Sequence, residues 1–477
     1  SKYLAKKPVH IIQQESERCD LKRTLSAANL VSLGIGCIIG AGIFVMTGQA
    51  AAQYAGPAII ISFIIAGLCC AFAGLCYAEL ASMLPVSGSA YSYSYASLGE
   101  IVAWVMGWLL LLEYGVAAST VAVGWSGYVV SFLGNFGIVV PEMLTTPTLQ
   151  MDHDTHALIN TGGINLPALF GILSMTALLV VGVKESATVN NVIVFVKLAV
   201  VMLFIGIGVF YVNPDNWVPF IPENTGETGR YGWSGILRGA GIVFFAYVGF
   251  EAVSTAAQEA KNPKRDVPIG ILGSLFVCTL LYMAVALVLT GVVHYDTLNV
   301  PDPIAKAVDA IQIPWLSFLV KIGAIAGLTS VMMVLLYGQT RIFYTMSRDG
   351  LMPPIFSRVH PKFQTPWINT VLVGSVIGVV AATTPIDILG DLVSLGTLTA
   401  FALICFTVLY LRKAEPNLER PFRVPFAPYF PVLGILFCGY LIFGLLSNPI
   451  TVQFYLYYLA VGLVVYFTYS HKHSKLQ

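Results

Sequence analysis

The sequence predicts an all-α polytopic membrane protein that crosses the bilayer with twelve helices. Three observations predict this class. The 477 residues are 57% hydrophobic and only 10% charged, against about 25% charged residues in soluble domains, and the mean hydropathy is +0.80. The chain contains twelve apolar runs of the ~20 residues that a helix needs to cross a bilayer. Lysine and arginine also gather in alternate loops.

The twelve runs follow one another along the whole chain. They lie near residues 27–50, 57–84, 99–134, 165–184, 189–212, 233–258, 267–294, 314–346, 367–384, 386–411, 427–447 and 452–470. A polar segment precedes the first run and many runs follow it, so we expect a permanent helix there and not a cleaved signal peptide.

The loop charges predict the orientation. If the N-terminus is cytoplasmic, the outer loops hold only two basic residues, Arg230 and Lys306. Three more lie inside the runs: Lys197, Arg238 and Lys321. Every other lysine and arginine falls on the cytoplasmic side. Because cytoplasmic loops carry the basic excess, we expect both termini in the cytoplasm and the protein in the plasma membrane. Arg238 and Lys321 lie near outer helix ends, where long side chains reach the interface, so we assign them no transport role. The net charge of +1 gives no field suited to nucleic acid.

The expected organisation has six parts. These are a cytoplasmic segment (1–26), five helices (27–212), an extracellular loop (213–232), five more helices (233–411), two peripheral helices (412–470) and a cytoplasmic tail (471–477).

The first run contains the stretch GCIIGAGIFV, whose glycines predict an interrupted helix. Gly40 and Gly42 let the backbone leave helical angles, so we expect an inner half ending near Ile39 and an outer half starting near Ala41. Inside hydrocarbon such a break survives only where it lines a protein-enclosed cavity. The outer half would present the free N–H groups of Ala41, Gly42 and Ile43 to an anion such as a carboxylate. The alternative is close packing of small residues against a neighbouring helix.

The sixth run, GAGIVFFAYVGFEAVS, predicts a second break. Interruption before Gly249 would free the carbonyls of Phe245, Ala246 and Val248, and carbonyl oxygens suit an ammonium group. Interrupted helices at matching positions in two sets of five are typical of inverted-repeat transporters with a site at the bilayer midplane. A ligand with a carboxylate and an ammonium on one carbon is an α-amino acid.

Five segments resemble the amino acid–polyamine–organocation superfamily. They are GCIIGAGIFVMTG at 36–48, PVSGSAYSYSY at 85–95, LEYGVAAS at 112–119, FFAYVGFEAVSTAAQEAKNPKRDVP at 244–268 and QTRIFYTMSRDGLMPP at 339–354. They look closest to the cationic amino acid transporters and their bacterial relatives. The resemblance implies a LeuT-type fold, with two inverted sets of five helices plus two peripheral helices, and amino acid transport by alternating access. Animal members of the branch carry two further helices that this chain lacks.

The resemblance also implies residue roles. The carbonyl of Ile38 would join the sixth-helix carbonyls in binding the substrate ammonium, while Ala41 and Gly42 hold the carboxylate. Phe245 would close over the substrate as a gate. Its ring excludes water while losing little rotamer entropy.

The pocket for the substrate side chain is expected between the third, sixth and eighth helices. Its expected lining is Phe245, Tyr247, Ser330 and Met333. Because this lining is mostly apolar, we expect small or apolar amino acids such as alanine. Arginine or lysine remains the alternative, since Glu113 offers one carboxylate.

The expected coupling ion is the proton. Lys197 lies about 16 Å along its helix from the cytoplasmic end, where an ionisable group is costly and desolvation favours release of its proton. The resemblance places its ammonium near the carbonyls of Gly36 and Ile39 and the hydroxyls of Thr329 and Ser330. The alternative is a permanently charged lysine that only holds helices together.

Two deeply placed glutamates leave several roles open. Glu113 shares the proton, pairs with a cationic substrate or hydrogen-bonds to a neighbouring helix. Glu251 would follow the sixth-helix break, where the helix dipole stabilises a carboxylate, so a structural role and proton sensing are equally supported.

Other function classes are less well supported. A non-transporting amino acid sensor would use the same site but remain locked in one state. None of the seven histidines lies in the interior of a run, and no HExxH motif occurs, so we expect no enzyme. The eight cysteines show no zinc spacing, and we expect neither a metal nor a cofactor. The sequence indicates no particular partner subunit.

Overall fold

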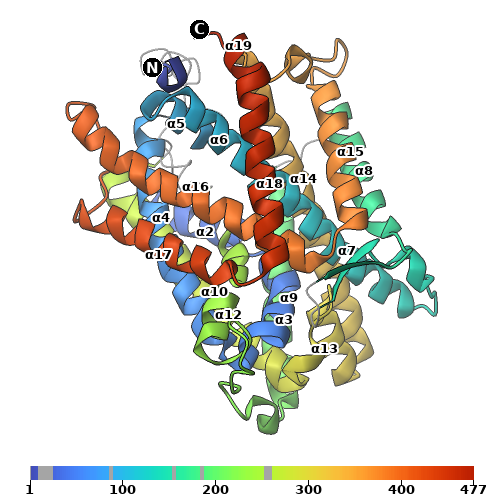
Figure 1. The fold of residues 1–477 in the computed structure, drawn as a ribbon. Coiled ribbons are helices and arrows are strands. Elements are labelled where there is room, and N and C mark those ends of the chain that lie inside the picture. The colour runs from blue at the N-terminus through green and yellow to red at the C-terminus, as the bar shows by residue number, and fades with distance from the viewer. Residues whose placement is uncertain are drawn as a thin grey trace.

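The computed structural model describes residues 2–8, 25–84, 90–152, 157–182, 187–251 and 260–476, with side chains from residue 191 in the fifth range. It is a bundle of helices in which both described ends of the chain lie on one face (Figure 1). Seven described stretches are long and apolar enough to cross a membrane, and three shorter apolar helices lie among them. The helical, polytopic class is therefore confirmed, while the count of twelve spans stays a prediction.

The helices of the first half occupy the first five predicted runs, apart from α5, which lies between the second and the third. They are α2 (Ala27–Ile38), α3 (Thr47–Ala50), α4 (Ile59–Met83), α5 (Ala90–Ser97), α6 (Glu100–Leu110), α7 (Ala117–Gly134), α8 (Leu166–Val181) and α9 (Ala187–Gly208). Wider π-helical turns adjoin some of them: η2 (Gly42–Met46) and η3 (Ala51–Ala55) flank α3, and η5 (Leu111–Val116) joins α6 to α7.

The second half continues in the same way. Its helices are α10 (Gly232–Val243), the 3-10 turn η9 (Phe244–Tyr247), α12 (Pro263–Val292), α13 (Pro303–Ile311), α14 (Pro314–Arg348), α15 (Trp367–Thr383), α16 (Ile386–Ala414), α17 (Tyr429–Leu445), α18 (Pro449–Val465) and α19 (His471–His473). Strands β1 (Leu149–Asp152) and β2 (Ala157–Asn160) pair antiparallel in a connection.

Local sequence explains where several helices begin and end. The side chains of Ser26, Asn165 and Asn448 accept hydrogen bonds from backbone N–H groups in the first turns of α2, α8 and α18. These bonds satisfy donors that a helix start leaves free. Gly182 ends α8 in a left-handed conformation with φ +93°, which glycine adopts without steric cost.

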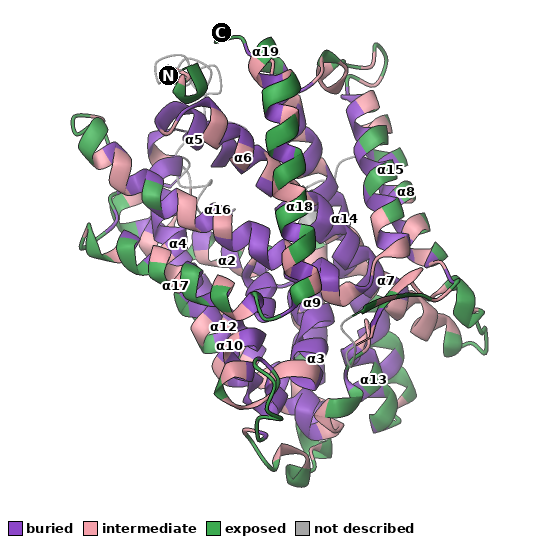
Figure 2. Ribbon diagram, in the orientation of Figure 1, coloured by how far each residue is buried: buried purple, intermediate pink, exposed green. Residues whose placement is uncertain are grey.

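Burial follows the pattern expected of a bundle in lipid. The centre of the bundle is buried, and the outer faces of α15, α17 and α18 are largely exposed (Figure 2). Large apolar side chains such as Phe195, Phe276 and Phe443 lie on exposed surfaces. A water-soluble monomer rarely exposes so many apolar groups, whereas hydrocarbon solvates them.

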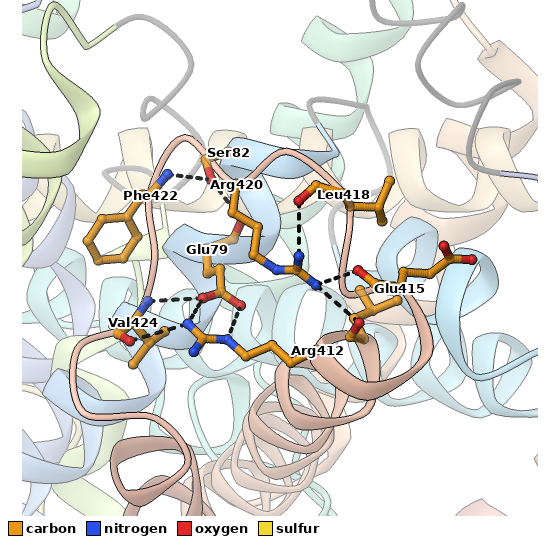
Figure 3. A network of polar contacts seen from close by, with 9 residues as sticks. Glu79, Ser82, Arg412, Glu415, Leu418, Arg420, Phe422 and Val424 are labelled. Carbon is orange, nitrogen blue, oxygen red and sulfur yellow. Dashed lines mark hydrogen bonds and ion pairs between the residues drawn. The ribbon is translucent and has the colours of Figure 1, made fainter.

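A polar network on the same side of the bundle as the termini holds the chain after α16 against α4 (Figure 3). Buried Glu79 accepts hydrogen bonds from the guanidinium of Arg412 and, at 3.0 Å, from the N–H of Val424. Arg420 donates to three backbone carbonyls around the end of α16, each at 3.0 Å. The buried carboxylate is therefore paired and hydrogen-bonded, as burial of a charge requires.

Two basic residues differ from the sequence expectation. Arg238 and Lys321 were expected to reach the membrane interface, but both side chains are 1% exposed and form ion pairs, with Asp391 and Asp309 respectively. That expectation was wrong, because each has an acidic partner on a neighbouring element that periodicity alone does not reveal.

Candidate functional site

The first helix is interrupted where the glycines predicted a break. Helix α2 ends at Ile38, and Ile39 has extended angles of φ −69° and ψ 113°. Helical structure resumes at Ala41 and continues into η2 from Gly42. The amides at this start lack partners one turn earlier in their own helix, so they are free to bind an anion.

The sixth helix is interrupted as well. Helix α10 passes into η9, and Val248 then takes extended angles of φ −61° and ψ 130°. Gly249 follows with φ +119°, and a Cβ there would lie 2.4 Å from the carbonyl oxygen of Cys37. Both the backbone angle and the close approach therefore require glycine at this position.

The two breaks pack directly against each other. A Cβ at Gly42 would lie 2.0 Å from the Cα of Ala246, and Gly249 contacts the end of α2 at Cys37. A break in each of the two helices is therefore buried at one place. Val248 is half-buried, and the other predicted binding residues of the two segments are buried. The buried ones are Ile38, Gly40, Ala41, Gly42, Ile43, Phe245 and Ala246.

Tyr282 of α12 joins the two breaks, and the sequence analysis missed it. Its hydroxyl oxygen lies 2.9 Å from the carbonyl oxygen of Ile38 and 2.8 Å from that of Ala246. A hydroxyl carries one proton, so it donates to one of these carbonyls at a time. Nothing in the local sequence marks this tyrosine, because its apolar run carries no sign of which helix its hydroxyl faces.

Helix α14, which carries two residues of the expected side-chain pocket, packs against the first break. A Cβ at Gly40 would lie 3.0 Å from Val331 Cγ2. Ser330 and Met333 are both buried and share one face, because they are three residues apart on a helix. Tyr247 differs from expectation: its hydroxyl lies 2.9 Å from the Phe63 carbonyl and contacts α12, so this side chain is directed toward α4 and α12.

Lys197 of α9 lies against α2 and α14. Its Nζ donates a hydrogen bond of 3.2 Å to the carbonyl of Gly36, and its aliphatic stem packs against Gly327 of α14. The expected neighbour Thr329 is engaged elsewhere, because its hydroxyl accepts from Trp125 at 2.9 Å and donates to Ile325 at 2.7 Å. The carbonyl of Gly36 is thus one of the expected partners of Lys197, and it lies where the resemblance placed it.

Glu113 and Glu251 are both buried. Glu113 lies in η5, and Glu251 follows the break of the sixth helix. Oε1 of Glu251 has no hydrogen-bond partner within the described ranges. The several roles that the sequence analysis assigned to each residue stay predictions.

A cavity of about 240 Å³ lies at the N-terminal end of α10. It is lined by the loop preceding that helix and by Tyr54, Arg238, Ser447 and Asn448. This cavity does not contain the residues of the two breaks.

A helical bundle with two interrupted helices in contact is the architecture of secondary transporters that bind solutes between broken helices. The family model for amino acid permeases matches residues 25–466, and the chain belongs to this family, within the amino acid–polyamine–organocation superfamily. The sequence resemblance is thereby confirmed.

Three relatives indicate the range of the family around this chain. The methylthioribose transporter of Bacillus subtilis is 47% identical over 477 residues, covering 100% of this chain and 99% of that protein. The branched-chain amino acid permease BcaP of the same species is 46% identical over 467 residues, covering 98% and 97%. The vacuolar cationic amino acid transporter 4 of Arabidopsis thaliana is 37% identical over 411 residues, covering 86% and 66%.

Proposed function

We propose that this permease takes up small or apolar L-amino acids together with protons across the plasma membrane. In this proposal the chain crosses the membrane twelve times with both termini in the cytoplasm. Residues 27–212 and 233–411 form two inverted halves that alternate access to a site between them. The observation that carries the proposal is the contact between the two helix breaks, at Gly42 and Ala246.

The chemistry of the breaks supports an amino acid as substrate. The free amides of Ala41, Gly42 and Ile43 suit a carboxylate, and the carbonyls of Ile38 and Ala246 converge on one hydroxyl proton from Tyr282. A carbonyl has two acceptor sites, so a substrate ammonium finds acceptors at the same place. The two charges of a zwitterion are thus both accommodated.

The side-chain pocket supports an apolar substrate. Phe245 and Met333 are apolar and buried, and a branched-chain permease is among the similar proteins. A cationic substrate would need a carboxylate partner, and only Glu113 was expected to offer one near this apolar lining. We therefore favour alanine and branched-chain amino acids over arginine and lysine.

The methylthioribose transporter supplies a second candidate substrate. 5-Methylthioribose has neither an ammonium nor a carboxylate, so it would leave the amides of one break and the carbonyls of the other without charged partners. Unpaired buried polar groups are costly. This favours the amino acid.

Competition experiments test the substrate class. Uptake of labelled leucine into proteoliposomes is measured with excess unlabelled alanine, leucine, N-acetyl-leucine, leucine amide, arginine or 5-methylthioribose. We expect competition by alanine and leucine only, because both charged groups are needed. Competition by 5-methylthioribose but not by alanine would overturn the proposal, and binding without flux would favour a sensor.

Phe245 is proposed as the gate over the substrate. The exposed Phe210 at the end of α9 provides a matched control, since its side chain is 84% exposed. We expect Phe245→Ala to reduce accumulation strongly and Phe210→Ala to leave it unchanged. Equal uptake by both variants would remove Phe245 from the gate.

Lys197 is proposed as the proton-coupling residue. Arginine stays charged in proteins, so Lys197→Arg keeps the positive charge but cannot release a proton. We expect proton-driven, sodium-independent uptake in the parent, and none in Lys197→Arg or Lys197→Met. A purely structural lysine predicts that Lys197→Arg still accumulates substrate.

A further inference from the structure

Helix α16 carries two buried hydroxyl groups that have no hydrogen-bond partner within the described part of the chain. They belong to Ser394 and Thr397, whose side chains are both 0% exposed. Thr399 and Thr407 on the same helix instead donate at 2.7 Å to backbone carbonyls four residues earlier. A bond of this kind is open to any serine or threonine in a helix. Its absence at Ser394 and Thr397 indicates that their hydroxyls are directed away from their own helix backbone.

The two hydroxyl-bearing residues share a helix face that contacts both interrupted helices. Positions 390, 394, 397 and 401 are three or four residues apart, so they form one stripe along α16. At one end of this stripe, a Cβ at Gly390 would lie 2.3 Å from Cε of Met46 in η2. At the other end, the ring centroid of Phe401 lies 5.5 Å from that of Phe244 in η9 and 5.3 Å from that of Phe250. The two hydroxyls lie between these contacts.

The stripe also places the hydroxyls at the depth of the first break. Along α16, Ser394 lies four residues, or about 6 Å, from Gly390 in the direction of Phe401. Along the first helix, Gly42 lies four residues, or about 6 Å, from Met46 in the direction of the break. Because Gly390 and Met46 are in contact, Ser394 is roughly level with Gly42, where the proposed substrate carboxylate is held.

The chemistry of the two hydroxyls selects the group that binds them. A buried hydroxyl without a partner is costly. Asp391, the carboxylate one turn away on α16, already accepts from Arg238 and Thr451. A hydroxyl donates one hydrogen bond and accepts others, so a substrate hydroxyl can satisfy two neighbouring hydroxyls at once, whereas a methyl group can satisfy neither.

We propose that Ser394 and Thr397 extend the side-chain pocket to α16 and hydrogen-bond the side-chain hydroxyl of serine and threonine, which the permease carries as well as alanine and the branched-chain amino acids. The inference rests on the proposed function, because it adds a substrate class to the same site. A site that hydrogen-bonds a substrate hydroxyl discriminates against the analogue that lacks it, because its own polar groups are then left unpaired.

Competition between threonine and valine tests the inference. These two amino acids have almost the same shape and differ by a hydroxyl in place of a methyl group. Inhibition constants of each are measured against uptake of labelled leucine into proteoliposomes, for the parent, Ser394→Ala, Thr397→Val and the double variant. Thr407→Val is the matched control, because Thr407 lies on the same helix and its hydroxyl is bonded to its own backbone.

We expect the parent to bind threonine at least as tightly as valine. In the double variant, the ratio of the two inhibition constants should shift toward valine by about tenfold or more, since a substrate hydroxyl is then buried without partners. Competition by alanine should stay unchanged in every variant, and Thr407→Val should keep the ratio of the parent. Removal of unpartnered hydroxyls should not lower the unfolding temperature, which checks that each variant is folded.

Two results would overturn the inference. One is a parent that valine inhibits and threonine does not. The other is an unchanged ratio in the double variant, which would mean that the two hydroxyls bind only water. Failure of alanine and leucine to compete in the parent would instead overturn the proposed function. Thermal stabilisation of the parent by threonine but not by valine, lost in the double variant, would then still show that the hydroxyls bind this ligand, and equal shifts would exclude it.

Discussion

The guanidinium of Arg238 and the carboxylate of Asp391 meet through two parallel hydrogen bonds of 2.9 and 2.6 Å. Both side chains are 1% exposed. Ser447 and Thr451 add bonds of 3.1 and 3.0 Å, and the ring of Tyr54 lies 4.6 Å from the guanidinium carbon. The pair ties α10 to α16 and satisfies both charges where water is scarce.

Removing one partner of this pair should destabilise the protein strongly. Asp391→Leu leaves a buried guanidinium without its carboxylate, and breaking a buried pair costs about 3–5 kcal/mol. Thermal unfolding in detergent measures the loss. The exposed ion pair of Asp296 with His294 gives the control Asp296→Asn, which should cost under about 1 kcal/mol. The double variant Arg238→Met/Asp391→Leu should recover much of the loss, and a double variant as unstable as the single one would contradict the explanation.

Gly42→Ala should abolish transport. The added methyl group would lie 2.0 Å from the Cα of Ala246, and neither backbone moves without displacing a break. Gly439→Ala in α17 is the matched control, because a Cβ there meets nothing within 4 Å. Uptake of labelled leucine by both variants, normalised to the amount of folded protein, checks the prediction. Normal uptake by Gly42→Ala would contradict the close packing of the two breaks.

Tyr282→Phe should destabilise the substrate-free protein more than the substrate-bound one. Without the hydroxyl, the carbonyls of Ile38 and Ala246 lose a donor, at a cost of about 1–3 kcal/mol for a buried unsatisfied group. A substrate ammonium replaces that donor. Leucine should therefore raise the unfolding temperature of Tyr282→Phe more than that of the parent.

The control for this prediction is Tyr455→Phe. The hydroxyl of Tyr455 bonds to Thr399 at 2.8 Å, away from the helix breaks, so leucine should stabilise this variant and the parent equally. An equal shift for Tyr282→Phe would show that its hydroxyl and the substrate do not share the carbonyls.

Asp302, at the start of α13, should make stability depend on pH. Burial raises the pKa of Asp302 to about 7, although Lys321 and Lys306 favour the carboxylate. A pKa raised above the unfolded value of ~3.9 means that the folded protein binds the proton more tightly. The contribution of Asp302 to the free energy of unfolding is then fully present at low pH and is lost as the pH rises through about 7. Asp302→Asn should thus raise the unfolding temperature at pH ~8 more than at pH ~4, and an equal rise at both would contradict a raised pKa.

Much of the fold was predictable because each signal was local. The apolar runs match α4, α8 and α15 closely, since hydrocarbon thickness fixes their length. The breaks near Gly40 and Gly249 were predictable because each follows a local cluster of glycines, and glycine lets the backbone leave helical angles. Both signals need only a short window of sequence.

The missed features all depend on partners that are distant in the sequence. Tyr282 and the Arg238–Asp391 pair join separate helices, and a helix periodicity does not reveal which helix lies opposite. Arg238 was misplaced for this reason: its position near a helix end suggested the interface, while its partner Asp391 lies 153 positions away.

The tight contact between Gly42 and Ala246 couples the movements of the two breaks. Because the backbone of Gly42 lies directly against Ala246, a displacement of the first helix at this point is transmitted to the sixth, and the reverse. Neither helix has room to shift at its break while the other stays in place. The two helices are therefore expected to move together, which favours two discrete conformations of the protein over a continuum of intermediate ones.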